Sequence, residues 1–371
     1  MLAFARSHQL GRVPKKGLPP MGQYHVGIDL HKSIVQACVL NSKGEIREER
    51  RFHIPDRASA EVLLTWLSEY LSDGRLAVEA LGCNRWFVNA CHERSWDVLV
   101  VDAGRLNLRR EGKKTDRRDA FEIARRLFLG DLHRCARTYY PTDVEYGRRK
   151  VMRTEHGQIQ KRTKTIAEIR GLLNAYKITV LTTQLWTQKS IAWLRTQTLP
   201  TEDLTFSLQV LVDDLDSVQR RILALKKRIK QTAEQDNEAR LWMEVLPSTG
   251  PQTALMIRAE LGDARRFKNA RTVSSYAGVV PRVMASADKA HHGRMTKRGN
   301  AHLRWILGQW AVRLLAKSET VQAWARSKYR TVHKNKVRVA LARRLLIGVW
   351  VMCTRGEVFS LERCLGMKSA A

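Results

Sequence analysis

The sequence predicts a mixed α/β domain, followed by a long helical region and a mostly helical C-terminal domain. The first third alternates short apolar runs with amphipathic segments in the order βββαβαβα, which is typical of a mixed sheet covered by helices. Residues 204–229 then carry apolar side chains at alternating spacings of four and three, which indicates a heptad repeat. Beyond residue 246, helical spacing continues among many lysines and arginines.

The expected elements of the first domain are three strands, a helix, a strand, a helix and a strand, over residues 24–29, 33–40, 45–54, 57–72, 75–79, 84–95 and 97–101. Asn41-Ser-Lys-Gly44 supplies the turn between the second and third strands. Thr115 is the expected N-cap of a further helix that begins at Asp116. This order of elements fits a ribonuclease-H-like domain.

The helical middle of the chain has a regular apolar seam, formed by Leu204, Leu208, Leu211, Leu215, Val218, Ile222, Leu225 and Ile229. A weaker seam precedes it and contains Ile159, Ile166, Ile169, Leu173 and Tyr176. Two long helices joined by a connector over residues 178–200 fit this pattern. The seam could close within one chain or between chains, and its regular spacing favours a coiled-coil contact between two copies in a dimer or tetramer.

In the last part of the chain, the turn Leu246-Pro-Ser-Thr-Gly-Pro251 precedes a helix over residues 253–261 and is similar to a helix-hairpin-helix. The aromatic residues of the basic segment 294–346 are expected to pack against helices rather than stack on bases; they are Trp305, Trp310, Trp324 and Tyr329. The expected division of the chain is a basic arm, an α/β domain, a helical region and a C-terminal domain, over residues 1–20, 21–144, 145–245 and 246–371. Met1 and Met21 are both candidate starts of translation.

The charge of the chain indicates a polyanionic partner. Lysine and arginine number 66 against 36 acids, which gives a formal net charge of +30. Nucleic acid is the expected partner, because phosphate contacts by lysine and arginine give sequence-independent affinity. The apolar stretch 345–353 is too short to span a bilayer. A cytoplasmic, nucleoid-associated protein without a membrane partner is therefore expected.

Four carboxylates of the first domain are the candidate metal ligands. Asp29 and Glu79 each close an apolar strand, where a buried carboxylate is costly unless it is paired or binds a metal. Asp116 and Asp119 are three residues apart and share one helix face. Their oxygen atoms suit Mg²⁺ or Mn²⁺, and two such ions can clamp the attacking and leaving oxygens of a phosphoryl transfer. The alternative that Asp116 and Asp119 only pair with nearby arginines stays open.

Basic residues close to these acids in the sequence are candidate nucleic-acid contacts. His31 and Lys32 follow Asp29 directly, and they would either touch the scissile phosphate or cap the strand. A basic run before the second acid pair would hold a DNA backbone near the metals, unless it is a solvated loop; it includes Arg109, Arg110, Lys113 and Lys114.

Separate motifs occur in both halves of the chain. The first half contains Gly27-Ile-Asp-Leu-His-Lys32, Val78-Glu79 and Lys114-Thr-Asp-Arg-Arg-Asp-Ala120. The second half contains Gly250-Pro-Gln-Thr-Ala254, Ala259-Glu-Leu-Gly-Asp263, Arg266-Phe267, Ser275-Tyr-Ala-Gly-Val279 and Gly293-Arg-Met-Thr-Lys-Arg-Gly-Asn300. In this order the motifs resemble those of the DEDD-type insertion-sequence transposases over roughly residues 24–360.

The resemblance implies a RuvC-like N-terminal domain whose catalytic metal ligands would be Asp29, Glu79, Asp116 and Asp119. It also implies a C-terminal domain with a serine nucleophile. The matching stretch is Pro281-Arg-Val-Met-Ala-Ser286-Ala-Asp-Lys289, which makes Ser286 the candidate. Attack on a DNA phosphate would leave a serine–phosphate link, and this link conserves bond energy for rejoining.

Around the serine, the resemblance implies charge stabilisation by Arg294, Lys297 and Arg298, and Arg304 is a further candidate nucleic-acid contact. The chain also departs from the family pattern. Ala285 and Ala287 flank the serine where the family has serine and glycine, and Ser248 stands where the family often has glycine. On the residues alone, Ser274 and Ser275 compete with Ser286 as nucleophiles.

For sequence choice, the resemblance implies a structured noncoding guide RNA, made from the end of the element, that pairs with target and donor DNA. A basic protein in which the sequence indicates no base-reading module is compatible with such a division of labour. The expected activity is therefore that of an RNA-guided DNA transposase or site-specific recombinase. Two rivals stay open: a RuvC-like nuclease that only hydrolyses DNA, and a non-catalytic nucleic-acid-binding protein.

Overall fold

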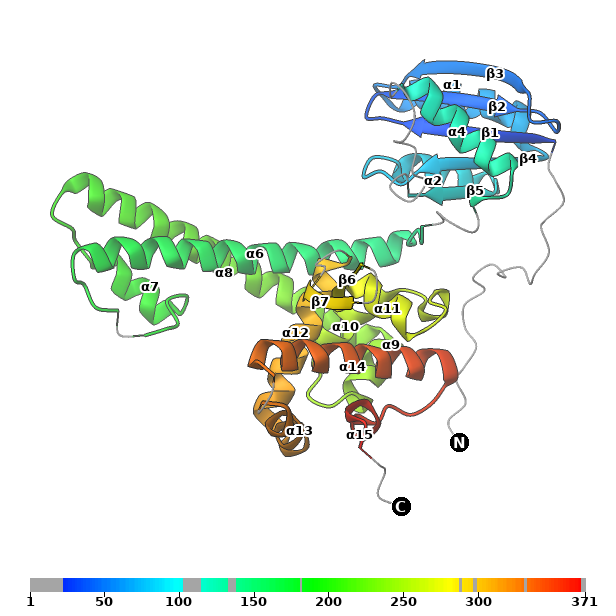
Figure 1. The fold of residues 1–371 in the computed structure, drawn as a ribbon. Helices are drawn as coiled ribbons and strands as arrows, with labels where there is room; N and C mark the ends of the chain where they lie inside the picture. Colours follow the sequence, from blue (N-terminus) through cyan, green and yellow to red (C-terminus); the bar gives the residue numbers. More distant parts are fainter. Residues whose placement is uncertain are drawn as a thin grey trace. The chain divides into compact units, whose positions relative to one another are not determined.

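The computed structural model describes residues 23–102, 115–132, 138–180, 182–286, 289–295, 299–329 and 332–367. The chain forms two compact units, with the division between Tyr140 and Pro141 (Figure 1). The first unit contains the predicted α/β domain, and the second contains both the long helices and the C-terminal domain. Among the described residues, no helix combines the length and the apolar character that a membrane crossing requires.

The first unit is built on a five-stranded sheet in the order β3-β2-β1-β4-β5. These strands are β1 (Tyr24–Leu30), β2 (Ile34–Leu40), β3 (Ile46–His53), β4 (Gly74–Glu79) and β5 (Val98–Val101). The pairs β1/β2 and β2/β3 are antiparallel, whereas β1/β4 and β4/β5 are parallel. The predicted mixed α/β sheet is confirmed, and its arrangement is consistent with a RuvC-like domain.

Helices cover both faces of this sheet; they are α1 (Arg57–Leu71), α2 (Arg85–Glu93) and α4 (Asp116–Phe128). Successive side chains of a strand point to opposite faces. Ile28 of β1 therefore packs in one core with α1 and α2. On the other face, Ala77 of β4 packs with Ile123 of α4. The α4 face is the one that carries the candidate acids.

Gly27 of β1 lets α4 approach the sheet closely. An added Cβ at this position would overlap the backbone atoms Ala120 O and Ala124 N, and it would lie 2.9 Å from Ala124 Cα. These are backbone atoms of a helix, so they cannot move aside as a flexible side chain could. The glycine in the first sequence motif thus has a packing reason, because it brings the first turns of α4 to the end of β1.

Gly27→Ala is expected to lower the free energy of unfolding of the first unit by at least about 1–3 kcal/mol, which is the usual cost of overpacking. Hydrogen exchange at the amides of β1 and α4 in the full-length protein measures this loss. Gly82→Ala is the matched control, because an added Cβ there meets no described atom within 4 Å. Equal protection in the two variants would contradict the close approach of α4.

The second unit begins with a long helical hairpin made by α6 (Asp143–Ala175) and α8 (Glu202–Gln235), with α7 (Gln188–Arg195) in the connector. The apolar residues of the first half of α8 pack against the second half of α6 and against α7. Near the other end of the hairpin, Ile229 of α8 shares a core with Met152 of α6. The two helices therefore run antiparallel within one chain, side by side in Figure 1.

This packing corrects the favoured interpretation of the heptad seam. Leu208, Leu215, Val218, Ile222 and Ile229 are all nearly inaccessible to solvent in the single chain. The seam thus closes within one chain, which is the alternative that the sequence analysis had left open. A heptad repeat specifies an apolar stripe but does not say which helix covers it. A contact between two copies through this seam is therefore wrong, and an oligomer would need another surface.

The remainder of the second unit is mostly helical. Its helices are α9 (Asn237–Val245), α10 (Pro251–Leu261), the 3₁₀ turn η1 (Ala264–Arg266), α11 (Ala270–Ala277), α12 (Ala301–Lys317), α13 (Glu319–Tyr329), α14 (Lys334–Arg355) and α15 (Leu361–Leu365). Trp310 lies fully buried in their shared core, and its Nε1 donates to Pro247 O at 2.8 Å. Trp310 thus has the packing role expected for it.

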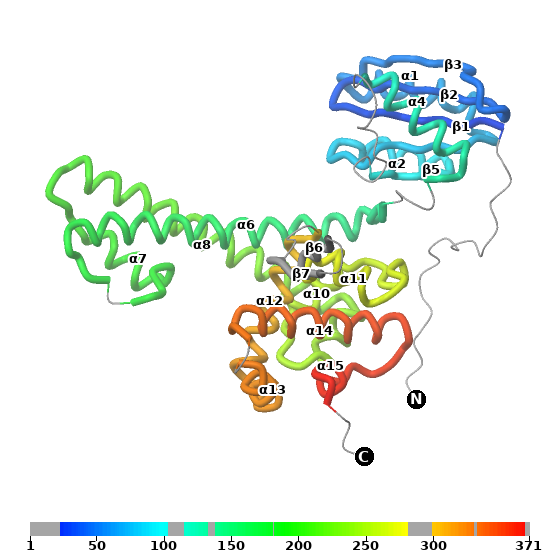
Figure 2. The backbone as a smooth tube through the Cα atoms, in the orientation of Figure 1, coloured from blue at the N-terminus to red at the C-terminus, as the bar shows by residue number. Residues whose placement is uncertain are grey.

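Two features of this part could not be seen in the sequence. The strands β6 (Pro281–Ser286) and β7 (Lys289–Met295) form an antiparallel hairpin (Figure 1). In the chain they come between α11 and α12, whose backbones Figure 2 traces. In the turn before α10, Ser248 has a φ of 54°, in the left-handed region that favours glycine. This geometry gives a physical reason for the glycine that the family often has at that position.

Candidate active site

The candidate acids of the sheet lie at the ends of two neighbouring parallel strands. Ile28 of β1 is paired with Val78 of β4, so Asp29 and Glu79 are the next residues along each strand. Parallel strands end at the same edge of a sheet, which places both acids there. Asp29 is only 2% exposed, whereas Glu79 is half-buried.

Both acids also point to the α4 face. Gly27 meets α4 directly, and Asp29 lies two residues further along the same strand. Ala77 packs against α4, and Glu79 lies two residues beyond it. Side chains two residues apart on a strand share a face. Strand alternation and strand register therefore bring these two predicted residues to one edge and one face of the sheet.

The other two acids lie in the first turn of α4. As predicted, Thr115 is the N-cap, and its side chain accepts a hydrogen bond from Arg118 N. Asp116 and Asp119 therefore lie at the helix N-terminus, where the helix dipole favours negative charge. Asp116 is 44% exposed at its side chain and Asp119 is buried, at 8%. Arg117 leaves this cluster and pairs with Glu49 of β3.

His31 lies between two of the acids. Its Nε2 is 3.2 Å from Asp29 Oδ2 and 3.4 Å from Asp116 Oδ1. Ligand atoms of Asp29, His31 and Asp116 all lie within 4.8 Å of one another. The structure thus shows a contact that the sequence analysis did not anticipate, since His31 bridges two carboxylates. The sequence signal for this contact is that His31 follows Asp29 by two residues at the end of a strand.

The charges of this cluster are only partly balanced. Burial raises the pKa of the Asp29 carboxyl; His31 lowers this pKa, whereas Asp116 and Asp119 raise it further. The net shift is upward, and burial is its largest cause, because the ionised carboxylate is costly where water is excluded. A divalent cation bound by these oxygen atoms would favour the ionised form of Asp29. Asp29 and Asp116 are therefore well placed to hold one, with His31 between them and with Asp119 and Glu79 on the same side of the sheet.

The basic candidates of the first unit are only partly described. Lys32 follows His31 in the exposed turn between β1 and β2. The predicted contacts Arg109, Arg110, Lys113 and Lys114 lie outside the described residues. Their role near the acids stays a prediction.

The candidate serine lies in the second unit, at the tip of the β6–β7 hairpin. Ser286 is the last residue of β6, and its Cα is paired with that of Lys289. Arg294 lies on β7. The predicted contacts Lys297 and Arg298 lie outside the described residues. The four acids and Ser286 thus belong to different units of the chain.

Two other predicted residues near the serine are engaged within the fold. Arg304, a candidate nucleic-acid contact, is half-buried, and its Nη1 donates to Ala277 O at 3.3 Å. Ser274 is fully buried in α11, and its Oγ donates to Ala270 O at 2.7 Å. Ser274 is therefore a poor nucleophile, whereas Ser275 is exposed and is a suitable control.

Comparison with known proteins adds evidence from the whole chain. A family model of DEDD-type transposases of IS110 elements matches residues 26–178, which include all four candidate acids. A second model, described as the transposase IS116/IS110/IS902 family, matches residues 242–330, which include Ser286.

Individual relatives agree with these matches. The chain is 24% identical to a transposase for insertion sequence element IS1111A of Coxiella burnetii, across 95% of this chain and 96% of that protein. It is 25% identical to a probable family 20 transposase of Pseudomonas aeruginosa, across 90% and 98% of the two chains. Over a shorter stretch, 34% of this chain and 39% of the other, it is 32% identical to a transposase for insertion sequence element IS1328 of Yersinia enterocolitica.

Proposed function

Because the chain belongs to the family of DEDD-type insertion-sequence transposases, we propose that it cuts and rejoins DNA as an RNA-guided, site-specific recombinase of its element. The observation that carries this proposal is the meeting of Asp29, His31 and Asp116 at one edge of the mixed sheet. The net charge of +30 supports a nucleic-acid substrate.

In this proposal, Asp29, Asp116 and Asp119 hold a divalent ion, Mg²⁺ or Mn²⁺, and Glu79 contributes from the neighbouring strand. The upward shift in the pKa of Asp29 supports the fit, because a cation would favour the ionised carboxylate. A bound divalent ion would supply Lewis-acid stabilisation of charge on the phosphate. The capped start of α4 keeps Asp116 and Asp119 in place, and His31 holds the side chains of Asp29 and Asp116 together.

The proposed nucleophile is Ser286. Its Oγ would form a bond to phosphorus while the bond from phosphorus to a deoxyribose oxygen breaks. The hydroxyl proton passes to a base, and the departing sugar oxygen takes up a proton. Arg294, Lys297 and Arg298 would stabilise the charge that develops on the phosphate. The family match over residues 242–330 supports this assignment. Reversal of the same step on a second strand would rejoin the DNA.

Sequence choice would rest on a structured noncoding RNA, with the basic protein holding nucleic-acid backbones. Strand exchange between two DNA sites would also need more than one copy of the chain. Since the seam of α8 closes within one chain, this assembly would use another surface. The expected division of labour is metal chemistry in the α/β unit and serine chemistry in the C-terminal part of the second unit.

The test is reconstitution of joining with purified full-length protein and labelled DNA that carries the element ends and a target. We expect joined products in Mg²⁺, their loss in EDTA, and their return when Mg²⁺ is restored in excess. The nucleic acid that copurifies at high salt should contain one discrete structured RNA, and its removal by ribonuclease should abolish joining.

Each failure has a separate meaning. Cleaved but unjoined DNA would favour the hydrolytic nuclease, and joining in EDTA would contradict the metal site. Copurification of random RNA fragments only would contradict guidance by RNA.

A further inference from the structure

The two ends of the segment that carries Ser286 lie side by side in the second unit. The segment follows Tyr276 near the end of α11 and ends at Asn300, the N-cap of α12. At this point Asn300 N donates to Tyr276 O at 2.7 Å. Gly299 has a φ of 110°, and an added Cβ there would lie 2.5 Å from Tyr276 O and 2.8 Å from Ser275 O. The base of the segment is therefore closed tightly.

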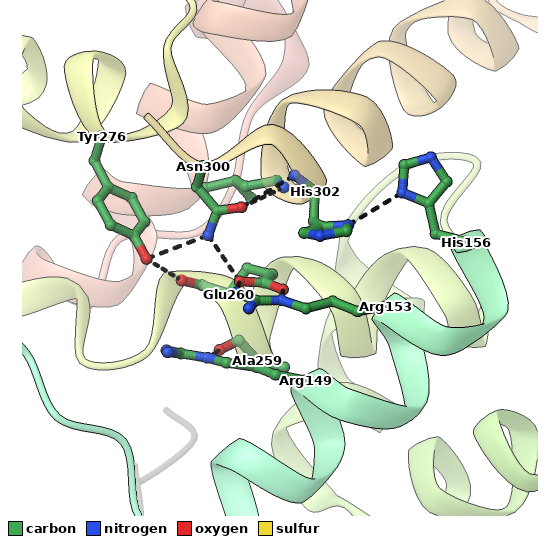
Figure 3. Close-up of polar contacts among 9 residues, drawn as sticks. Arg149, Arg153, His156, Ala259, Glu260, Tyr276, Asn300 and His302 are labelled. Atoms are coloured by element: carbon green, nitrogen blue, oxygen red, sulfur yellow. Dashed lines mark hydrogen bonds and ion pairs between the residues drawn. The ribbon is translucent and has the colours of Figure 1, made fainter. Parts of the chain in front are cut away.

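Glu260 of α10 lies beneath this base and contacts both ends of it (Figure 3). Its side chain has no solvent exposure. Glu260 Oε2 accepts a hydrogen bond from Asn300 Nδ2 at 2.7 Å, and the backbone oxygen of Glu260 accepts one from Tyr276 OH at 3.0 Å. One buried residue thus holds the residue before the segment and the residue after it.

Helix α6 supplies the charge that balances Glu260. Arg153 Nε donates to Glu260 Oε1 at 2.7 Å, and Arg153 Nη2 donates to Oε2 at 2.8 Å. Burial alone would raise the pKa of Glu260, but hydrogen bonds from Arg153 and Asn300 lower it below the ordinary value. Glu260 therefore stays ionised, and a bidentate pair of this kind is both strong and directional.

A second contact ties the same region to α6. Nδ1 of His156 lies 3.1 Å from Nδ1 of His302, in the first turn of α12 (Figure 3). Burial lowers the pKa of both imidazoles, which favours the neutral ring that must accept when one imidazole donates to the other. The ring of His156 also stacks on Trp305, with centroids 3.9 Å apart.

Asn300 uses both ends of its amide. Its Oδ1 accepts from His302 N at 3.1 Å and from Leu303 N at 3.0 Å, and this caps α12. Its Nδ2 donates to Glu260 and lies 3.3 Å from Tyr276 OH. The capping role and the link to Glu260 can therefore be separated by substitution.

We propose that Glu260 is a positioning residue that fixes both ends of the Ser286 segment through Tyr276 and Asn300, and ties them to α6 through Arg153. This inference rests on the proposed role of Ser286. The inference also gives a role to Glu260, Tyr276 and Asn300. These residues lie in motifs of the sequence that the proposed serine chemistry alone does not explain. These three residues and Arg153, called the clamp below, thus fix where the Ser286 segment begins and ends.

The test exchanges donor and acceptor across the clamp in the full-length protein. Glu260→Gln introduces an amide whose NH₂ must face either Asn300 Nδ2 or Arg153 Nε, both of which are donors. Asn300→Asp keeps an oxygen for the cap of α12 but sets a carboxylate oxygen against Glu260. The double variant restores a donor and an acceptor between residues 260 and 300 with the direction reversed, although the amide NH₂ then also faces Arg153 Nη2.

We expect each single variant to form the serine–DNA adduct on the order of 100-fold more slowly, since small misplacements of a nucleophile are this costly. DNA affinity should be unchanged, and the double variant should regain part of the rate, since the contact between residues 260 and 300 is restored but the bond from Arg153 Nη2 is not. Hydrogen exchange at β6 and β7 should rise in each single variant and fall again in the double variant. Glu238→Gln is the matched control. Glu238 of α9 forms an ion pair with Arg258 of α10 at 2.5 Å, and neither residue belongs to the clamp.

Unchanged adduct formation and exchange in both single variants would overturn the proposal, as would a double variant without any recovery. If the wild-type protein itself forms no adduct, the proposed serine chemistry fails. In that case hydrogen exchange at β6 and β7 decides alone: recovery in the double variant supports the clamp, and its absence overturns it.

Discussion

Asp119→Asn is expected to abolish cutting and joining of DNA while DNA binding persists. Asp119 is 8% exposed in the first turn of α4, and its charge is one of those that raise the pKa of Asp29. The asparagine side chain has nearly the same shape but carries no charge, so the proposed cation site loses one anionic ligand. A loss of at least about 100-fold in rate is expected, since metal stabilisation supplies several kcal/mol and each 1.4 kcal/mol is worth about tenfold.

A second measurement separates this effect from misfolding. In the wild-type protein, a divalent ion that binds only the folded state should raise the unfolding temperature. In Asp119→Asn that increase should shrink or vanish. Without metal, the variant should still give a cooperative unfolding transition like that of the wild type, which would show that it is folded.

Asp97→Asn is the matched control for this variant, since Asp97 is in the same unit and is 73% exposed at its side chain. Its activity should equal that of the wild type. Recombination that survives Asp119→Asn would remove the metal proposal and favour ordinary salt bridges as the role of these acids.

Ser286→Ala is expected to eliminate both the covalent protein–DNA adduct and the joining of DNA. The loss of joining rate should be larger than for any other single substitution in the second unit. Without the hydroxyl, the chain has no oxygen at this position to form the bond to phosphorus. Denaturing electrophoresis of reactions with labelled DNA would reveal the adduct directly, and DNA affinity should be retained. Loss of the adduct with retained cleavage would identify water as an alternative nucleophile.

Ser275→Ala provides the matched control, since Ser275 is exposed and lies in the preceding helix. The buried hydroxyl of Ser274 is engaged with Ala270 O, so Ser274 is unsuitable for comparison. A Ser286→Ala protein that still joined strands would show that the serine assignment is wrong. A protein in which only Ser275→Ala abolished the adduct would move the nucleophile to α11.

The α/β unit was the most predictable part of the chain, because its signals are local. The run from Tyr24 to Leu30 is buried almost throughout, and apolar runs of this kind indicate a central strand. Thr115 was recognisable as an N-cap from its residue type and its place before the helical spacing. The sequence also showed that Asp29 and Glu79 each close a strand, but their common edge depends on the pairing of β1 with β4.

The parts that sequence reasoning missed depend on contacts between distant residues. The strand Lys289–Met295 contains no β-branched residue, so β7 had no strand signature. Arg153 and Glu260 are 107 residues apart, and neither carries a local signal of burial. His31 could be placed near Asp29, but its position between Asp29 and Asp116 required the packing of α4 on the sheet.

The long helices α6 and α8 cover each other's apolar stripe inside a single polypeptide. Folding of this helical hairpin is therefore a first-order process, and its rate does not depend on the concentration of the protein. A chain made once would reach its folded form as quickly as one made in abundance. A low concentration of the protein would then slow only the meeting of copies that the proposed strand exchange requires.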